Sequence, residues 1–284
     1  MTVYSHSRIS SFENCPLQYR YRYVDRIRLD TVGVEAFVGK VVHEVLEALY
    51  KDPGHARQAG PQAFTAMFND IWRRKLSPSV RIVREKMTLE DYRELGERCV
   101  AGFYARHHPF ESGEVLGCET RVEFKLDGEG RFRMLGFIDR IDRVAPGVIE
   151  IHDYKTGSLP RPGALKKDRQ LTLYEIAVRE RWENVREVRQ VWHYLAHDKQ
   201  FVEQRSTDDL GRTRLSTIRA IQGIEGTVEF PARTSALCSW CEYQRICPEW
   251  EGRLATGPAR PDTAPPQTAP GSDQYLLFGG SSTR

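Results

Sequence analysis

Hydrophobic and polar residues alternate through the middle of the chain with a period of two, which is typical of β-strands that bury one face. Two such runs, residues 119–127 and 132–144, flank the glycine-rich segment 128–130 and predict a β-hairpin. Residues 148–155 begin as a short apolar stretch of the same period, which predicts a buried strand next to the hairpin.

Helical periodicity dominates the rest of the chain. Apolar residues recur at the spacing of an amphipathic helix in residues 39–50, 61–76, 88–108, 164–182 and 207–224. A second strand pair is predicted at residues 188–196 and 200–205. Hairpin, strand, helix and strands in this order predict an α/β fold with a mixed sheet flanked by helices. Residues of about 55–110 are expected to form a helical insertion over that sheet.

Composition places the chain among ordinary globular proteins. It has 284 residues, of which 40% are hydrophobic and 29% are charged, and its net charge is +3. No apolar run approaches the length of a membrane span and no signal peptide is evident, so a cytoplasmic location without membrane contact is expected. Because the net charge is small, a nucleic-acid surface would have to be a local basic patch.

Three cysteines, Cys238, Cys241 and Cys247, cluster late in the chain. In a reducing cytoplasm, clustered cysteines are metal ligands more often than they are disulfides. Cys99 and Cys118 stand alone in apolar or mixed settings and are expected to be small, buried or partly buried hydrophobic residues.

A carboxylate and an ammonium stand at the end of the predicted strand 148–155. Asp153 and Lys155 are two residues apart, so they point to the same face of that strand. The carboxylate can hold a divalent cation, and the lysine can position a water or stabilise charge on a phosphate. This pair indicates metal-dependent phosphodiester chemistry. The alternative is an exposed ion pair at a strand end, which contributes little.

Asp139 lies among apolar residues in the second strand of the hairpin, on the same face as Phe137 and Ile141. An unpaired carboxylate is costly in such a place, which indicates either a metal ion or a salt bridge. The neighbouring Arg140 or Arg143 could supply the simple ion pair.

Two predicted helices carry polar pairs four residues apart, His43 with Glu47 and Gln170 with Tyr174. Residues at this spacing share one side of a helix. A single histidine on a helix is structural in most proteins, so this segment by itself assigns His43 no role.

Tyrosines alternate with arginines near the N-terminus. Tyr19, Tyr21 and Tyr23 are interleaved with Arg20 and Arg22. Two interpretations remain open: an amphipathic packing segment, or a basic surface whose rings stack on single-stranded nucleic acid.

Taken together, these segments resemble the RecB-type branch of the PD-(D/E)XK nucleases, and specifically the branch with an iron–sulfur cluster. The resemblance covers most of residues 4–250. The motifs that carry it are, in chain order, Ser5-x-Ser7-Arg8-Ile9-x-x-Phe12-x-x-Cys15-Pro16, Gly39-x-x-x-His43-x-x-Leu46-Glu47, Gly136-Phe137-Ile138-Asp139, Asp153-Tyr154-Lys155 and Gln170-x-x-x-Tyr174. It implies the restriction-endonuclease-like form of the mixed sheet.

The resemblance also implies an active site. By it, Mg²⁺ or Mn²⁺ would be bound by His43, Asp139, Asp153 and the backbone carbonyl of Tyr154, a ligand set that suits these ions. Lys155 would position the attacking water. Gln170 and Tyr174 would touch the substrate strand or orient Lys155.

The implied function is that of a metal-dependent deoxyribonuclease, exonuclease-like, cutting single-stranded DNA or DNA ends in repair, recombination or CRISPR adaptation. The alternative is a non-catalytic iron–sulfur module that binds DNA or acts as a scaffold. The intact set of Asp139, Asp153 and Lys155 argues against that alternative. Residues 1–253 would form the nuclease domain.

A 4Fe–4S cluster held by Cys15, Cys238, Cys241 and Cys247 is a further implication of the resemblance. The same four thiolates would suit a structural zinc ion, so the spacing alone leaves both open. Either group would tie Cys15 to the C-terminal cysteines and close a long loop of chain.

Residues 254–284 have the composition of a disordered linker followed by a short peptide. Gln274-Tyr275-Leu276-Leu277-Phe278 resembles the bacterial sliding-clamp-binding peptide Gln-x-x-Leu-Phe. In that mode, Gln274 would bond the polar edge of a pocket while Leu277 and Phe278 fill its apolar part. The alternative is a hydrophobic segment that folds back on the domain.

Overall fold

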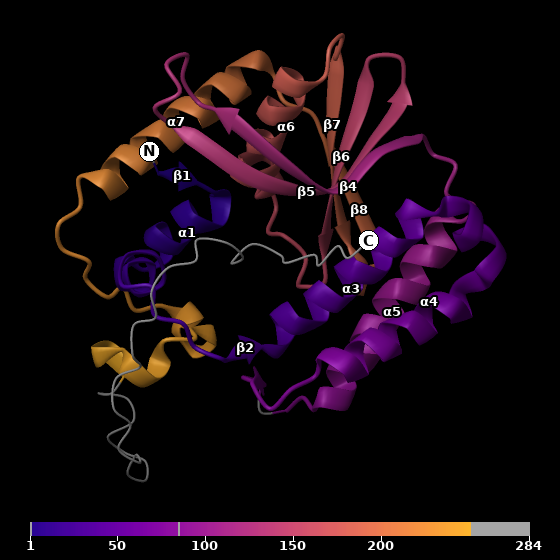
Figure 1. Cartoon of the computed structure of the whole chain (residues 1–284), viewed down its shortest axis with the longest axis horizontal. Coiled ribbons are helices and arrows are strands. Elements are labelled where there is room, and N and C mark those ends of the chain that lie inside the picture. The colour runs from indigo at the N-terminus through magenta and orange to yellow at the C-terminus, as the bar shows by residue number, and fades with distance from the viewer. Residues whose placement is uncertain (1, 85, 251–284) are drawn as a thin grey trace, which may run out of the picture.

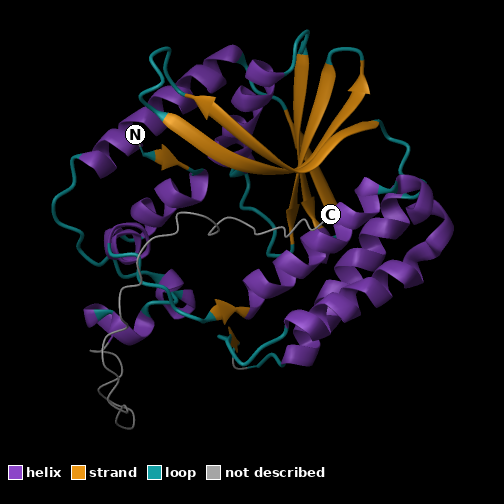
Figure 2. Ribbon diagram, viewed as in Figure 1, coloured by secondary structure: helices purple, strands orange, loops and turns teal. Residues whose placement is uncertain are grey.

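A six-stranded mixed sheet runs through the molecule, with helices on both of its faces (Figures 1 and 2). It is seen in a computed structural model that describes residues 2–84 and 86–250. This architecture confirms the α/β fold with a mixed sheet flanked by helices that the sequence pattern predicted. No helix among the described residues has the length and apolar composition that a membrane span requires.

The hairpin and the strand after it form the centre of the sheet. The strands are β1 (Val3–Tyr4), β4 (Glu114–Lys125), β5 (Arg133–Ala145), β6 (Val148–Lys155), β7 (Glu187–Tyr194) and β8 (Lys199–Glu203). β5 pairs antiparallel with β4 and with β6, and its start pairs parallel with β1. β7 is parallel to β6 and antiparallel to β8. The two short strands β2 (Val32–Gly33) and β3 (Val80–Arg81) form a separate parallel pair.

The five α-helices that the structure describes after residue 33 occupy the stretches where helical periodicity was found, and two shorter helices precede them. The α-helices are α1 (His6–Asn14), α2 (Pro16–Tyr19), α3 (Val34–Lys51), α4 (Pro53–Lys75), α5 (Leu89–His107), α6 (Arg169–Arg181) and α7 (Thr207–Glu225). Shorter turns of π- or 3₁₀-helix are η1 (Arg20–Val24), η2 (Leu165–Lys167), η3 (Leu195–His197), η4 (Ala236–Trp240) and η5 (Gln244–Ile246).

Two hydrophobic cores fill the layers on either side of the sheet. Helices α3, α4 and α5 pack on one face, and their core joins Leu49, Phe68 and Phe103. Helices α1, α6 and α7 cover the other face, with Leu173 and Ile221 in the second core. Figure 1 shows the two groups of helices separated by the sheet. The strand β6 therefore presents alternate residues to two different helical layers.

Two helices differ from the predicted ones, one because of a capping residue and the other because of a kink. The helix predicted at 164–182 is split because Asp168 accepts a hydrogen bond from Leu171 N at 2.9 Å and so caps α6 at Arg169. Helix α4 begins before the predicted residue 61. Gly60 has φ 75°, outside the helical region, and Pro61 follows it, so α4 is two helical pieces joined by a kink.

The strands β5 and β6 separate before β6 ends. Their paired register runs from Ala145 with Val148 to Arg140 with His152 and goes no further. Beyond His152, β6 continues to Lys155 paired only with β7. A gap therefore opens between β5 and the end of β6, at the positions of the predicted active-site motifs.

Segments from the two ends of the described chain lie side by side. Leu17 N donates to Pro231 O at 3.3 Å, and Tyr21 Oη donates to Ile246 O at 3.2 Å. Arg22 forms an ion pair with Glu242. The segment around α2 is thus packed against the segment that carries η4 and η5.

Candidate active site between the separated strands

Asp153 and Lys155 point to the same face at the end of β6, as strand alternation requires. Lys155 Nζ lies 2.7 Å from Asp153 Oδ2 and 3.5 Å from Gln170 Oε1 of α6. The amide of Gln170 donates in turn to Tyr174 Oη at 3.5 Å. Asp153 is only 3% exposed while the Lys155 side chain is 37% exposed, so the carboxylate of this pair is buried and its ammonium reaches the surface.

The ring of Tyr174 rests on the backbone of Gly136 in β5. A Cβ atom added at Gly136 would overlap this ring, so glycine is needed for the close approach of strand and helix. This contact explains in physical terms why a glycine stands three residues before Asp139. It also fixes the side of α6 that carries Gln170.

Asp139 spans the gap between the two separated strands. Its Oδ2 accepts a hydrogen bond from Tyr154 N at 2.8 Å, which replaces the ladder bond that β5 no longer supplies. The simple ion-pair alternative for Asp139 is wrong. Arg140 Nε lies 3.1 Å from Asp142 Oδ2 instead, and Arg143 pairs with Glu114 at 2.7 Å.

His43 reaches this gap from α3, on the opposite side of the sheet from Lys155. Its Nε2 lies 2.9 Å from Tyr154 O, and its Nδ1 lies 3.6 Å from Asp139 Oδ2. The sequence pattern alone gave His43 no role, and the structure brings it to within contact of two motif residues. Glu47, four residues later on the helix, pairs with Lys51 at 2.8 Å instead.

Glu119 is a functional candidate that the sequence reasoning missed. Its Oε1 lies 3.5 Å from His43 Nδ1. The hairpin register pairs Cys118 with Arg140 and Thr120 with Ile138, so Glu119 lies directly opposite Asp139. This neighbour could have been found by counting back from the predicted turn at 128–130, because the register of a hairpin follows from its turn.

The backbone around Glu119 is irregular. Glu119 has φ 44°, in the left-handed region that residues other than glycine rarely occupy. The strand register also shifts between Val115 and Gly117. A Cβ atom on Gly117 would overlap the side chain of Thr120. Bulges of this kind re-aim side chains next to active sites, and here the carboxylate of Glu119 faces His43.

Charges of the same sign meet at this site. Burial raises the pKa of Asp139, and the Asp153 and Glu119 carboxylates raise it further, although His43 opposes them. Burial lowers the pKa of His43, but the Asp139 and Glu119 carboxylates outweigh it and raise the pKa to about 9. Burial also opposes the charge on Lys155, yet Asp153 raises the pKa of that ammonium. The three carboxylates of the site thus face only two cationic side chains, His43 and Lys155.

The donor set fits a hard divalent cation. Within the described residues, His43, Glu119 and Asp139 are the group whose metal-ligating atoms all lie within 4.8 Å of one another. Carboxylate oxygens with one imidazole suit Mg²⁺ or Mn²⁺. Such a cation would relieve the repulsion that raises the pKa of Asp139.

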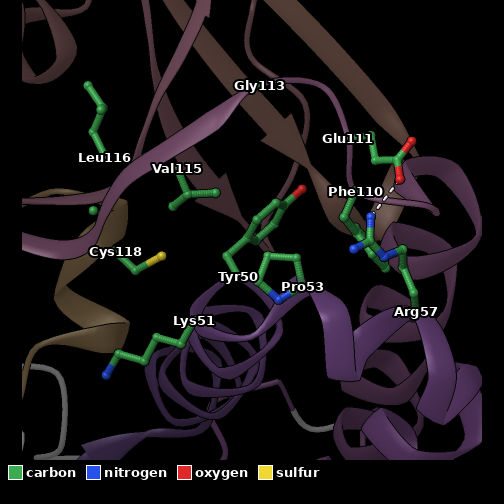
Figure 3. Close-up of a pocket in the computed structure, with 11 residues that line it drawn as sticks. Tyr50, Lys51, Pro53, Arg57, Phe110, Glu111, Gly113, Val115, Leu116 and Cys118 are labelled. Atoms are coloured by element: carbon green, nitrogen blue, oxygen red, sulfur yellow. Dashed lines mark hydrogen bonds and ion pairs between the residues drawn. The ribbon is translucent and has the colours of Figure 1, made fainter.

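A hollow of about 620 Å³ lies between the end of α3 and the first half of β4. Cys118, the residue before Glu119, lines it, together with Lys51 at the end of α3. Figure 3 shows Lys51 on one side of the hollow and Arg57, paired with Glu111, on the other. The hollow is therefore lined by two cations, each of which is paired with a carboxylate.

The four predicted cysteine ligands come from two segments that the fold brings together. Cys15 Sγ accepts a hydrogen bond from Arg233 N at 3.3 Å, and Cys238 Sγ accepts one from Ser235 N at 3.3 Å. Burial raises the pKa of Cys241 to about 11, and negative charge on Cys15 and Cys247 would raise it too. Cys99, by contrast, is fully buried, as expected of a small hydrophobic residue.

The N-terminal tyrosines are packing residues in this structure. Tyr19 is 3% exposed, and its ring stacks on Phe230 with centroids 6.1 Å apart. The Tyr21 ring lies against Tyr243 with centroids 5.4 Å apart. Tyr23 is half-buried against the Arg8 guanidinium. The contacts favour the packing interpretation over rings free to stack on nucleic acid.

The predicted clamp-binding peptide, Gln274 with Leu277 and Phe278, lies outside the described residues, as do the linker before it and the end of the predicted nuclease domain.

Comparisons with known proteins address the fold and the family. The model of the PD-(D/E)XK nuclease superfamily matches residues 3–248. A candidate exonuclease of Eubacterium rectale aligns with a TM-score of 0.51 at 14% identity, over 92% of this chain and 91% of that one, and at this identity the likeness concerns the fold alone. The protein SSO0001 aligns with a TM-score of 0.36 at 14% identity, over 85% and 94% of the two chains, which is too low to carry an argument. No curated protein matches the sequence.

Proposed function

The chain belongs to the PD-(D/E)XK nuclease superfamily, and on this premise we propose that it is a metal-dependent deoxyribonuclease acting on single-stranded DNA or DNA ends. One observation carries the proposal: Lys155 and Asp153 pair at 2.7 Å beside a gap where Asp139, Glu119 and His43 meet. Burying these carboxylates is costly, and a metal-binding role explains that cost. A non-catalytic DNA-binding scaffold would not require it.

Each side chain has a distinct task in this proposal. His43, Glu119, Asp139 and Asp153, with the Tyr154 carbonyl, would hold the divalent cation, which lowers the pKa of a water and neutralises phosphate charge. The Lys155 ammonium, fixed by Asp153 and Gln170, would orient that water and stabilise charge on the phosphate oxygens. Gln170 is itself placed by Tyr174.

The preference for strands or ends is the finer part of the proposal. The protein of similar fold from Eubacterium rectale is described as a candidate exonuclease, which favours ends as the first substrate to test. The hollow beside Cys118 could accept the strand beyond the scissile phosphate, with Lys51 and Arg57 near its backbone.

The test is an Mn²⁺-dependent assay on end-labelled single- and double-stranded DNA of both polarities. Asp153→Ala and Lys155→Ala should each reduce cleavage by about 10²–10³-fold or more, because each removes a group that stabilises the transition state. Lys75→Ala is the matched control, since Lys75 also pairs with a carboxylate, Glu44, but stands on α4, which carries none of the motif residues. Cleavage by Lys155→Ala at the wild-type rate would refute the assigned chemistry.

We further propose that the chain is of the RecB type and that Cys15, Cys238, Cys241 and Cys247 hold a 4Fe–4S cluster. Sulfur ligands of one zinc ion lie within roughly 4 Å of one another, because each is about 2.3 Å from the metal. In the described residues, the group of ligating atoms within 4.8 Å of one another is at the active site, not at the cysteines. The iron–sulfur assignment therefore rests on the resemblance to the RecB-type branch, because the same four thiolates would also suit a zinc ion.

The C-terminal peptide is proposed to bind the bacterial sliding clamp through Gln274, Leu277 and Phe278. About 20 residues of Pro/Ala/Thr-rich sequence precede it, a composition that acts as a tether and would raise the local concentration of the nuclease at the clamp.

A further inference from the structure

A closed polar network lies behind the active-site strand, on the face opposite Asp153 and Lys155. At its centre, Arg140 of β5 and His152 of β6 are register partners, the last pair before the two strands separate. Arg140 Nε lies 3.1 Å from Asp142 Oδ2, and both side chains are at most 2% exposed. The sequence motifs give this buried ion pair no task.

The guanidinium of Arg140 has further partners at both terminal nitrogens and beneath its plane, whereas its Nε approaches Asp142 as an ion pair without a hydrogen bond. Its Nη1 donates to Tyr154 Oη at 2.9 Å, and its Nη2 lies 3.1 Å from the ring nitrogens of His152. The ring of Tyr50 lies beneath it, 3.7 Å from centroid to guanidinium carbon. His152 is held in turn by His193, with Nδ1 and Nε2 3.0 Å apart. Burial lowers the pKa of both histidines, so His152 contacts Arg140, and His193 contacts His152, as neutral rings.

Tyr154 is the residue through which this network meets the active site. Its backbone N–H donates to Asp139 at 2.8 Å, and its carbonyl oxygen lies 2.9 Å from His43 Nε2. Its ring packs edge-on against the His43 ring with centroids 5.7 Å apart. The hydroxyl at the far end of the same side chain is the group that Arg140 holds. Tyr154 is therefore fixed at its peptide and at its hydroxyl.

We propose that Arg140 and Asp142 are positioning residues, which act through the Tyr154 hydroxyl to fix the orientation of the Tyr154 peptide at the metal site. This rests on the proposed metal-dependent function. Past His152 no ladder bond from β5 holds this peptide, so on that side it is bonded only by the Asp139 and His43 side chains, while β7 pairs with the other edge of β6. A buried ion pair is weak evidence for stability, because apolar residues often replace one without loss. Outer partners that orient metal ligands, in contrast, affect metal affinity strongly.

The decisive variant is Tyr154→Phe, which removes only the hydroxyl and keeps the packed ring. Mn²⁺ affinity measured by calorimetry without nucleic acid should fall about tenfold, in line with the effect of outer partners at other metal sites. At saturating Mn²⁺, kcat should fall while KM for an oligonucleotide stays unchanged. Tyr104→Phe is the matched control, because it also removes one buried tyrosine bond, to Ala56 O at 2.8 Å, away from the site.

A second variant removes the ion pair as a unit. Arg140→Met combined with Asp142→Asn leaves neither charge buried and unpaired, which favours a folded protein. It should weaken Mn²⁺ binding as much as Tyr154→Phe does, and adding Tyr154→Phe to it should cause little further loss.

Wild-type Mn²⁺ affinity in Tyr154→Phe, or an equal loss in Tyr104→Phe, would overturn the proposed positioning role. The calorimetric measurement also separates it from the proposed function. The wild-type protein could bind Mn²⁺ and yet cut no nucleic acid. Weaker Mn²⁺ binding in the variants would then support the positioning role, while the nuclease function would be refuted. A wild-type protein that binds no Mn²⁺ would overturn both.

Discussion

At the scale of single residues, the site is defined by carboxylates that the fold forces together. Glu119 and Asp139 face each other across the hairpin, and His43 lies within 3.6 Å of both. The ligand atoms of the two carboxylates lie within 4.8 Å of each other, and like charges so close resist ionisation together unless a cation compensates them. Glu119 is therefore expected to bind the metal ion together with Asp139.

Glu119→Gln tests this expectation. The amide keeps the size of the side chain but removes its charge, so Mn²⁺ affinity should fall about tenfold, or roughly 1.4 kcal/mol. Calorimetric titration of the protein with Mn²⁺ measures the change. Glu114→Gln is the control on the same strand, because Glu114 pairs with Arg143 at 2.7 Å away from the gap. Equal affinity in Glu119→Gln and wild type would remove Glu119 from the ligand set.

At the scale of elements, the separation of β5 from β6 creates the site. The last ladder pair is Arg140 with His152, and Asp139 then bonds Tyr154 N across the gap. Helix α6 approaches from one face and α3 from the other. The close approach of α6 depends on Gly136, which leaves room for the Tyr174 ring.

Gly136→Ala should therefore destabilise the protein through a clash with Tyr174. Overpacking of this kind costs about 1–3 kcal/mol of unfolding free energy, measurable by urea denaturation. In a Tyr174→Ala background the loss of unfolding free energy should largely disappear, because the ring that clashes with the added Cβ atom is absent. Gly102→Ala in α5, where an added Cβ meets nothing within 4 Å, should instead be neutral or stabilising. If Gly136→Ala lowers the free energy of unfolding equally in the Tyr174→Ala background, this explanation is contradicted.

At the scale of the whole molecule, the two ends of the described chain are held against each other. Cys15 and Arg233 are 218 residues apart in sequence and are joined by a hydrogen bond of 3.3 Å. Closing so long a loop costs entropy, and a group bound by thiolates from both segments would offset it.

Loss of a cysteine from the predicted cluster should have a visible and a thermodynamic effect. Purified wild-type protein should be brown, with a broad absorbance near about 400 nm, as expected for a 4Fe–4S cluster. Cys15→Ser or Cys241→Ser should bleach it and lower the melting temperature. Cys99→Ala, at a buried cysteine outside this set, should keep the colour. Colourless wild-type protein with one zinc ion per chain would refute the iron assignment but not the nuclease.

The proposed clamp contact is tested by deleting residues 273–284. Cleavage of free oligonucleotides should be unchanged, because the deleted residues lie outside the active-site motifs, while binding to purified clamp should be lost. Surface plasmon resonance with immobilised clamp measures this. Leu277→Ala with Phe278→Ala should have the same effect as the deletion, and wild-type affinity in that double variant would end the proposal.

The elements and part of the site could be predicted from the amino-acid sequence. Alternation placed the hairpin and β6, and it put Asp153 and Lys155 on one face, because these patterns depend on neighbours in the chain. The register of the hairpin also contained the position of Glu119 opposite Asp139. These features are local, so a linear pattern can encode them.

The contacts between groups distant in the sequence could not be predicted in this way and depend on how the elements pack. His43 contacts Tyr154, 111 residues away, because α3 packs beside the separated strands. Arg140 was a candidate partner for Asp139 in the sequence, yet adjacent strand residues face opposite sides, and it pairs with Asp142 instead. Cys15 reaches the segment of Cys238 by packing that no periodicity reveals. Such contacts depend on the burial of whole elements against one another, which a pattern of neighbouring residues does not specify.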